Sequence, residues 1–249
     1  MTVNKPLNAI TVPSAPVLIT GGTQRLGLAI AENLLDQGYS VLVTYRRDKP
    51  AVLALRDKGA DCIQADFADE AGISAFIAYV LQHYQALRAV IHNASQWLKN
   101  GALDNEHELM RIMWSVHVSA PYQLNLAFEE LLKNQTHNQL SDIIHMTDYV
   151  VEKGSSKHIA YAASKAGLAN LTHSFAARLA PRVKVNSIAP SLLMFNQGDK
   201  PEYKTKALAK SLMAVEPGAA EAVQAVNYIM SSQYLTGRTI GLDGGRHLV

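Results

Sequence analysis

The chain has 249 residues, of which 48% are hydrophobic and 18% charged, and its formal net charge is +2. This length and composition fit one α/β domain with a sizeable core, and the mild, scattered charge argues against nucleic acid as a partner. The lone Cys62 excludes an internal disulfide, and without a signal-like start or a long apolar run we expect a cytoplasmic protein that does not enter membranes.

The first residues are polar and rich in proline, so we expect an N-terminal extension over residues 1–15 and one domain over residues 16–249. A short apolar strand is predicted over residues 17–20. It leads directly into Thr-Gly-Gly-Thr-Gln-Arg-Leu-Gly, residues 20–27, and a helix with apolar residues at helical spacing follows as far as Gly38. Strand, glycine turn and helix in this order are the parts of a dinucleotide-binding site.

Two glycines of this loop have distinct expected tasks. Gly21 permits the tight turn, and Gly27 lets the helix pack close to the sheet, so that a pyrophosphate lies over the helix N-terminus. Arg25 and Leu26 lie between them, and we count both among the cofactor-binding residues. An ordinary strand-to-helix turn is the alternative, but the position directly after the first strand favours a cofactor site.

The end of the second predicted strand, over residues 39–45, indicates which cofactor binds. A carboxylate at this point would accept hydrogen bonds from the ribose 2′-hydroxyl of NAD, whereas a cation accommodates the 2′-phosphate of NADP. The chain has Tyr45-Arg46-Arg47 here, with Arg25 available from the glycine loop, and this predicts NADPH. The alternative is that Arg46 and Arg47 are solvated turn charges.

Polar residues also follow the next two predicted strands, over residues 60–64 and 88–92, which an amphipathic helix over residues 70–84 separates. Asp66 follows the third strand, where it would accept a hydrogen bond from an adenine amino group or cap the next helix. Asn93 follows the fourth strand and opens the sequence Asn-Ala-Ser-Gln-Trp.

The middle of the chain carries residues suited to acid–base chemistry. A buried strand is predicted over residues 142–147, and it ends at Asp148, whose carboxyl would project into the ligand crevice of an open α/β sheet. Tyr161 and Lys165 are four residues apart in a helix-forming stretch, so their side chains share one face. An ammonium fixed beside a phenol is expected to favour the phenolate and to ease proton transfer.

This tyrosine–lysine spacing occurs three times, at Tyr45, Tyr149 and Tyr161. Tyr45 enters a charged turn that ends at Pro50. Tyr149 precedes two valines and then Gly154, which makes a poor helix. Only Tyr161 lies in a long helix-forming stretch, and it is therefore the predicted catalytic tyrosine.

The remaining predicted elements complete an alternating pattern. They are helices over 104–116, 118–133 and 218–232, a sixth strand over 183–188 followed by Pro190, a lid over 193–216, and a last strand that begins at Thr239. Strands that alternate with helices throughout imply a single α/β domain with a doubly wound parallel sheet, Rossmann-like in its order.

Five motifs occur in one order: Thr20-Gly21 to Gly27, Asp66, Asn93-Ala94, the Tyr161/Lys165 pair and the Pro190 turn. With these motifs the chain resembles a short-chain dehydrogenase/reductase over nearly all of its length after the first fifteen residues. The resemblance implies that the motif residues contact the cofactor, among them Asn93, Tyr161, Lys165 and Pro190. It also implies a homo-tetramer that forms through the helices near 118–133 and 158–179.

Two departures from the general family pattern indicate one branch. The pattern has glycine at Arg25 and serine at Asp148, and the pteridine reductase branch resembles this chain at both positions. That branch also has an aromatic residue that sandwiches a pterin ring against the nicotinamide, and Trp97 falls at the matching position. The resemblance therefore implies a pterin substrate, bound by Arg25, Ser95, Trp97, Asp148 and Leu192. The alternatives are a core position for Trp97 and a capping role for Asp148.

His117 stands where the family usually has an asparagine that orders a water near the lysine. Either a ring nitrogen of His117 does the same, or the proton relay runs differently. The sequence contains no His-Glu-x-x-His pattern, so we expect no metal site.

The leading hypothesis is an NADPH-dependent reductase of a dihydropterin, in which C6 receives a hydride, N5 receives a proton, and Asp148, Tyr161 and Lys165 are catalytic. A carbonyl reductase of the same fold, acting on an oxoacyl or sugar ketone, is the alternative, but it expects serine at position 148. A cofactor-sensing protein that has lost catalysis is a third possibility, which the intact Tyr161/Lys165 pair argues against.

Overall fold

The computed structural model of the chain describes residues 15–134 and 140–249, so the expected extension over residues 1–15 lies almost entirely outside the described residues. In the described part, one sheet of seven parallel strands has the order β3-β2-β1-β4-β5-β6-β7. Its strands are Val17–Ile19 (β1), Val41–Tyr45 (β2), Asp61–Gln64 (β3), Ala89–His92 (β4), Ser141–Met146 (β5), Val183–Pro190 (β6) and Thr239–Leu242 (β7). The order runs outward in both directions from β1 and β4, which confirms the doubly wound α/β fold.

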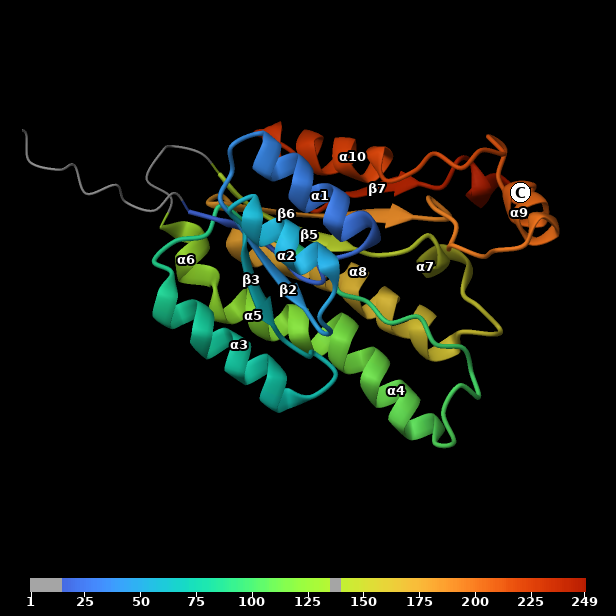
Figure 1. Ribbon diagram of the computed structural model, residues 1–249, viewed down its shortest axis with the longest axis horizontal. Helices are drawn as coiled ribbons and strands as arrows, with labels where there is room; N and C mark the ends of the chain where they lie inside the picture. The colour runs from blue at the N-terminus through green and yellow to red at the C-terminus, as the bar shows by residue number, and fades with distance from the viewer. Residues whose placement is uncertain (1–14, 135–139) are drawn as a thin grey trace, which may run out of the picture.

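Helices cover both faces of this sheet (Figure 1). One layer is formed by Arg25–Asp36 (α1), Pro50–Asp57 (α2) and Ala220–Ser231 (α10). The other layer is formed by Glu70–His83 (α3), Ala120–Ala127 (α5), Glu129–Lys133 (α6) and Ile159–Leu179 (α8), and Glu106–Trp114 (α4) packs against α8. Figure 1 shows α1 and α10 on one side of the strands and α3 and α5 on the other.

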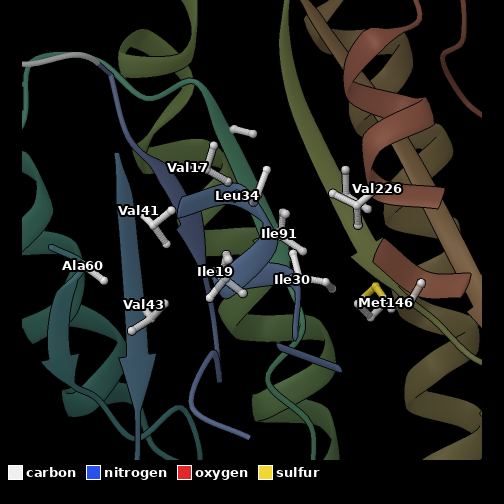
Figure 2. Packing of buried hydrophobic residues seen from close by; sticks show 14 of the residues in the cluster. Val17, Ile19, Ile30, Leu34, Val41, Val43, Ala60, Ile91, Met146 and Val226 are labelled. Carbon is white, nitrogen blue, oxygen red and sulfur yellow. The ribbon is translucent and has the colours of Figure 1, made fainter. Parts of the chain in front are cut away.

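The central strands are apolar on both faces because both faces are covered. Val17 and Ile19 of β1 pack with Ile30 of α1 in one core (Figure 2). Leu18 instead faces the α3 layer in a second core. All four side chains are almost fully buried. This two-sided burial explains why the strands appear in the sequence as short continuous apolar runs rather than as alternating patterns.

Several predicted boundaries were wrong. The helix after the glycine loop begins at Arg25, one turn earlier than expected, and α2 was not predicted at all. The helical stretch expected to run over 118–133 is divided: a π-helical turn, Ser115–Ser119 (η1), separates α4 from α5, and Phe128 separates α5 from α6. The widened turn of a π-helix leaves no trace in apolar spacing, because the residues on either side keep their helical pattern.

Three shorter helical elements complete the described chain, the last of them the 3₁₀ helix Arg246–Leu248 (η2). Val150–Lys153 (α7) forms where a poor helix was expected, and it ends after one turn at Gly154, which has a positive φ of 70°. Pro201–Leu208 (α9) lies within the expected lid over residues 193–216 and stands apart from the sheet near the C-terminus (Figure 1). None of the helices in the described ranges is long and apolar enough to span a bilayer.

A buried ion cluster closes the sheet at the edge where the strands begin. Arg88 Nη1 lies 2.6 Å from Asp142 Oδ2, and Lys184 Nζ lies 2.9 Å from Asp142 Oδ1. The two cations also donate to backbone carbonyls at the end of α10, Arg88 to Met230 at 3.0 Å and Lys184 to Ile229 at 2.6 Å. The cluster therefore joins the starts of three adjacent strands to the C-terminus of a covering helix, where cations also complement the helix dipole.

Candidate active site

The loop between β1 and α1 depends on the absence of side chains at two glycines. Gly21 has a positive φ of 66°, and a Cβ there would come within 3.0 Å of the Ala94 Cα. A Cβ at Gly27 would overlap the amide nitrogen of Asn93 and the carbonyl oxygen of Gly21. Both expected tasks, the tight turn at Gly21 and the close approach at Gly27, are present in the fold.

Asn93 holds this loop in place. Its side-chain nitrogen donates to the carbonyl oxygens of Thr20 at 3.1 Å and Gly21 at 2.9 Å. The backbone nitrogens of Asn93 and Ala94 each donate to the Thr20 hydroxyl at 3.0 Å. The amide hydrogens of Asn93 are thus used on the loop, so Asn93 contributes to a cofactor site mainly by fixing the loop that forms it.

A cleft of about 560 Å³ opens where the strand order reverses, at the carboxyl ends of the central strands. Of the residues predicted for the cofactor and substrate, Gly21, Arg25, Leu26, Arg46, Asp66, Asn93, Ser95 and Trp97 line it. Four cations border it: Arg25, Arg46, Arg47 and Lys49. Helix α1 begins here without a side-chain cap and without an acidic residue in its first turn, an arrangement that favours a bound anion.

Arg25 makes contacts that the sequence did not indicate. Its φ is +48°, a left-handed conformation that glycine adopts freely and other residues adopt at a cost. Its guanidinium donates to the Met194 carbonyl at 2.9 Å and to Asn196 Oδ1 at 2.7 Å. Arg25 therefore connects the glycine loop to the first residues of the 193–216 segment, and the cation lies between that segment and the cleft.

Of the two roles predicted for Asp66, adenine binding and a helix cap, the helix cap is taken by a neighbouring residue. Asp66 Oδ1 accepts from the Ala68 backbone nitrogen at 2.9 Å, so this carboxylate holds the turn after β3. The cap of α3 is instead Asp69, which accepts from Gly72 at 2.8 Å. Asp66 lines the cleft, as an adenine-binding residue would.

The three predicted catalytic side chains come together at the end of β5. The Tyr161 hydroxyl donates to Asp148 Oδ2 at 2.8 Å, and Lys165 Nζ lies 5.7 Å from the centroid of the Tyr161 ring. Lys165 Nζ donates to the Met146 carbonyl at 2.6 Å. Asp148 Oδ1 accepts from the Val150 backbone nitrogen at 2.8 Å, so one carboxylate oxygen caps α7 while the other faces the tyrosine.

The pKa of Tyr161 is shifted in the direction opposite to the expected one. Burial, followed by the charge and hydrogen bond of Asp148, raises the pKa of Tyr161 well above its ordinary value. Burial and the carboxylate therefore determine the direction of this shift, and the expected stabilisation of the phenolate by Lys165 stays a prediction. Burial also lowers the pKa of Lys165 to about 8, although the Asp148 charge opposes that shift. Tyr161 is therefore held as a protonated donor.

Neither of the other two tyrosine–lysine pairs brings its tyrosine hydroxyl to a carboxylate. Tyr45 is buried, and the Arg56 guanidinium lies 6.0 Å from its ring centroid. The Arg246 guanidinium lies 4.5 Å from the Tyr149 ring, and Lys153 donates to carbonyls of Arg246 and Val249. Among the three tyrosines, Tyr161 is the one whose hydroxyl meets a carboxylate.

Trp97 lies on the wall of the cleft with 65% of its surface exposed, so its alternative placement in the core was wrong. Its indole stacks on the His158 imidazole, with ring centroids 4.3 Å apart and planes inclined by 15°. The loop that carries Trp97 is also pinned to the start of α8: Asn100 N donates to the Lys157 carbonyl at 2.9 Å, and Ile159 N donates to Asn100 Oδ1 at 3.1 Å.

Six predicted residues lie outside the lining of the cleft: Gly27, the three catalytic residues Asp148, Tyr161 and Lys165, and the pair Pro190 and Leu192. Pro190 ends β6, and its carbonyl accepts from the Tyr149 nitrogen at 3.1 Å. Leu192 follows it and is partly buried. Both lie near the carboxyl ends of the strands, but neither is among the residues that line the cleft.

His117 connects the wall of the cleft to the catalytic helix. It lies in the π-helical turn, is 1% exposed, and its ring meets the Tyr161 ring edge-on at 5.4 Å and 86°. Nε2 lies 2.9 Å from Ser95 Oγ, and Nδ1 lies 2.8 Å from Ser164 Oγ. Sequence reasoning singled out His117 but missed Ser164, which lies in a run of small residues typical of any tightly packed helix.

A second buried chain of polar groups lies in the core below the site. His92 Nε2 lies 2.7 Å from Asn125 Oδ1, Asn125 Nδ2 lies 3.2 Å from His145 Nε2, and His145 Nδ1 lies 2.9 Å from Thr172 Oγ1. Burial lowers the pKa of His92 to about 4 and lowers the pKa values of His145 and His117 well below the ordinary value. These imidazoles are therefore neutral in the folded protein.

We expect the folded protein to lose stability in mild acid. Because the three imidazoles have lower pKa values folded than unfolded, their stabilising contribution is present above about pH 6.5 and is lost as the pH falls below it, for His92 as far as its folded pKa of about 4. Each imidazole that is protonated only in the unfolded chain contributes a slope of about 1.4 kcal/mol per pH unit. Urea unfolding between pH 7.5 and 5 measures the slope. His92→Gln should reduce the slope by about 1.4 kcal/mol per pH unit, because unfolding then takes up about one proton fewer. A free energy of unfolding that stays constant from pH 7.5 to 5 would contradict the assignment of neutral imidazoles.

Residues 15–134 and 140–249 contain no group of three or more histidine, cysteine, aspartate or glutamate side chains that could hold a metal ion.

Comparison with known proteins identifies the class of enzyme to which this chain is similar. The family described as Enoyl-(Acyl carrier protein) reductase matches residues 22–247. Dihydromonapterin reductase from Enterobacter sp. (strain 638) is 52% identical over 236 residues, which cover 95% of this chain and 98% of that protein. Dihydromonapterin reductase from Escherichia coli O6:H1 is also 52% identical, over 94% of this chain and 98% of that protein.

A solved structure is similar over the same extent. FolM Alternative dihydrofolate reductase 1 from Brucella canis, complexed with NADP, has a TM-score of 0.81 at 29% identity and covers 96% of both chains. Its counterpart from Brucella suis, also in complex with NADP, has a TM-score of 0.80 at 28% identity, over 96% of this chain and 97% of that one. The chain belongs to the short-chain dehydrogenase/reductase family, in the branch that includes the dihydromonapterin reductases.

Proposed function

We propose that this chain is an NADPH-dependent reductase of a dihydropterin, which converts 7,8-dihydromonapterin to tetrahydromonapterin and also accepts dihydrofolate. The observation that carries the proposal is the carboxylate of Asp148 at 2.8 Å from the Tyr161 hydroxyl, together with the exposed indole of Trp97 on the cleft wall. The identity of 52% to dihydromonapterin reductases, over nearly the full length of both chains, supports the same substrate.

The residues that border the cleft fit a phosphorylated dinucleotide. The cleft extends along the glycine loop to the N-terminus of α1, where no acidic side chain would compete with a pyrophosphate. Arg46 and Arg47 follow β2, where a 2′-phosphate would lie, and Lys49 adds a further cation. NADPH, when bound, supplies the hydride that C6 of the pterin receives.

The protein's own residues supply the proton and the orientation. Tyr161, held protonated by burial and by Asp148, is a donor at the end of β5, and Lys165 holds the nicotinamide ribose. Asp148 bonds to the amino-bearing edge of the pterin or passes a proton toward N5 through Tyr161. A flat, electron-poor bicycle requires stacking, and Trp97 offers a face for it.

The test is steady-state oxidation of NADPH with dihydromonapterin, dihydrobiopterin, dihydrofolate, an enoyl thioester and a β-ketoacyl thioester. We expect the largest kcat/KM for a dihydropterin and a clear rate with dihydrofolate. A larger kcat/KM for either thioester would replace this proposal with an acyl or carbonyl reductase. The absence of turnover with all five would favour a cofactor-sensing protein.

Arg46→Ala is expected to lower the affinity for NADPH by about tenfold or more, because a charge-assisted hydrogen bond contributes about 1.5–3 kcal/mol. NADH, which lacks the 2′-phosphate, should bind almost unchanged. Fluorescence titration of both cofactors measures the two constants. Arg178→Ala is the matched control, because Arg178 pairs with Glu129 on the surface and does not line the cleft. An equal loss for NADPH and NADH would make Arg46 a structural residue.

Trp97→Ala is expected to raise the pterin KM about 3- to 10-fold, the range for one aromatic stacking contact of 0.5–1.5 kcal/mol. The KM for NADPH and the melting temperature should change little, because most of the indole is exposed. Trp114→Ala is the control: that indole lies against Gly167 between α4 and α8, away from the cleft. A Trp97→Ala protein with an unchanged pterin KM would remove Trp97 from the substrate site.

We further propose a homo-tetramer in the cytoplasm. The family resemblance supports assembly through the faces of α5 and α8, where Tyr122 is 48% exposed, and the single cysteine suits a reducing compartment. Native mass spectrometry should give four times the mass of one chain, and Tyr122→Glu should yield a smaller species.

A further inference from the structure

The hydrogen bonds around His117 identify the position of its ring proton. The Ser164 hydroxyl donates its one hydrogen to the Tyr161 carbonyl at 2.7 Å, so at the 2.8 Å contact with His117 it must accept, and Nδ1 carries the proton. Independently, the backbone N–H of Gln96 points at His117 Nε2 at 3.3 Å, which requires Nε2 to be an acceptor. Both observations give the same neutral tautomer, Nδ1–H.

This tautomer determines what Ser95 does at rest. Since Nε2 has no hydrogen, the 2.9 Å contact between Ser95 Oγ and His117 Nε2 must be donated by the serine. The Ser95 hydroxyl also lies within hydrogen-bonding reach of the Tyr161 oxygen, where it opposes the upward shift of the tyrosine pKa. A serine has one hydroxyl hydrogen, so it serves one of these acceptors at a time.

The same bonds show that His117 does not conduct a proton. The Ser95 hydroxyl donates to His117 Nε2, and His117 Nδ1–H donates to the Ser164 hydroxyl. The Ser164 hydroxyl donates to the main-chain carbonyl of Tyr161, which has no hydrogen to pass on, so the chain of donors ends there. The ring is 1% exposed, and burial together with the nearby Lys165 charge disfavours its protonation. Protons that replenish Tyr161 must therefore arrive from the side of Asp148 and Lys165.

We infer that Ser95 is a two-position hydrogen-bond donor: its hydroxyl rests on His117 Nε2 and turns to the Tyr161 oxygen when that phenol gives up its proton, and His117 is the positioning residue that sets the resting position. A neutral phenol already donating to Asp148 is a weaker acceptor than an imidazole nitrogen, whereas a phenolate is a stronger one. When Ser95 turns away, the N–H of Gln96 still satisfies Nε2. The inference uses the proposed function only in requiring Tyr161 to lose a proton during turnover.

Variants of the two residues are expected to act in opposite directions. Ser95→Ala removes the donor, so the single-turnover rate of NADPH oxidation should fall about tenfold at an unchanged pterin KM. His117→Phe leaves the Ser95 hydrogen with Tyr161 as its acceptor, so the rate should rise. The double variant should match Ser95→Ala, because His117 acts only through Ser95.

A second route tests the tautomer and avoids placing a larger ring in the core. Ser164→Ala removes the acceptor of Nδ1–H, which frees the ring to place its proton on Nε2, and the single-turnover rate should then rise as in His117→Phe. Ser141→Ala is the control for loss of a buried hydroxyl: Ser141 is 0% exposed and donates to the Leu132 carbonyl at 2.6 Å, at the end of the sheet where the strands begin. It should lower the melting temperature without raising the single-turnover rate.

Single-turnover rates that fall in both Ser95→Ala and His117→Phe, or losses that multiply in the double variant, would overturn the inference. A Ser95→Ala protein whose pterin KM rises while its single-turnover rate stays constant would also overturn it, because Ser95 would then be a substrate ligand. Failure of the proposed function is distinguishable: it appears in the unaltered chain as the absence of dihydropterin turnover, and the same variants are then measured with whichever substrate is reduced.

Discussion

Asp148→Ser is expected to lower the rate of pterin reduction by about 100-fold or more, the effect of losing a positioned acid–base group. The carboxylate has two occupied oxygens, one on the Tyr161 hydroxyl and one on the Val150 nitrogen. Serine has one oxygen and is a good cap, so it can hold α7 or face Tyr161 but cannot do both. The fold and the binding of NADPH should survive while turnover falls.

Asp148→Asn separates two roles of the carboxylate, orientation of the pterin and proton transfer. An amide bonds to the edge of a pterin and keeps the shape of the side chain, but it does not transfer a proton. Single-turnover rates for the two variants, with Tyr161→Phe as the inactive reference, separate orientation from proton transfer. Retained turnover in Asp148→Asn would make Asp148 an orienting residue. Full activity in Asp148→Ser would make the carboxylate incidental and remove the strongest residue-level support for a pterin substrate.

Asp142→Asn is expected to destabilise the folded protein by about 3–5 kcal/mol, because it leaves two buried cations without a counter-charge. Arg88 is 7% exposed and Lys184 is 4% exposed, so water cannot replace the lost carboxylate. Urea unfolding at pH 7.5 measures the loss. Glu32→Gln is the matched control, since its pair with Lys58 lies on the surface and contributes about 0–1 kcal/mol.

Replacing all three charged residues of the ion cluster with apolar ones is the sharper test. Arg88→Met, Asp142→Leu and Lys184→Met together remove every buried charge and should recover part of the stability lost in Asp142→Asn. Recovery should be incomplete, because the two cations also donate to the carbonyls at the end of α10. If Asp142→Asn cost no more than Glu32→Gln, burial of these charges would have to be incomplete in solution.

The fold could be predicted from the sequence because its signals are local. Short apolar runs, each followed by a turn and an amphipathic stretch, give the strand–helix alternation, and that alternation leads to a parallel sheet. Gly21 and Gly27 were interpretable for the same reason: their tasks involve the strand and helix on either side of them. The choice of Tyr161 over Tyr45 and Tyr149 also depended on local helix-forming sequence.

What escaped prediction depends on distant contacts or on burial. Arg25 donates to Asn196, 171 residues away, and no spacing in the sequence connects the two. The raised pKa of Tyr161 follows from the depth at which the phenol is buried, which the Tyr161/Lys165 spacing does not encode. Ser164 went unnoticed because its role exists only through the ring that it contacts.

The pinning of the Trp97 loop to α8 also bears on how substrate preference can diverge in this fold. Trp97 stacks on His158, and Asn100 bonds on both sides of that residue, to Lys157 and Ile159, two positions before Tyr161. The aromatic wall and the reacting hydroxyl are thus held at a fixed separation. Mutations cannot readily change that separation without also displacing the reacting hydroxyl. Diversification is left to the 193–216 segment, which meets the glycine loop through the hydrogen bonds of a single arginine in the described residues.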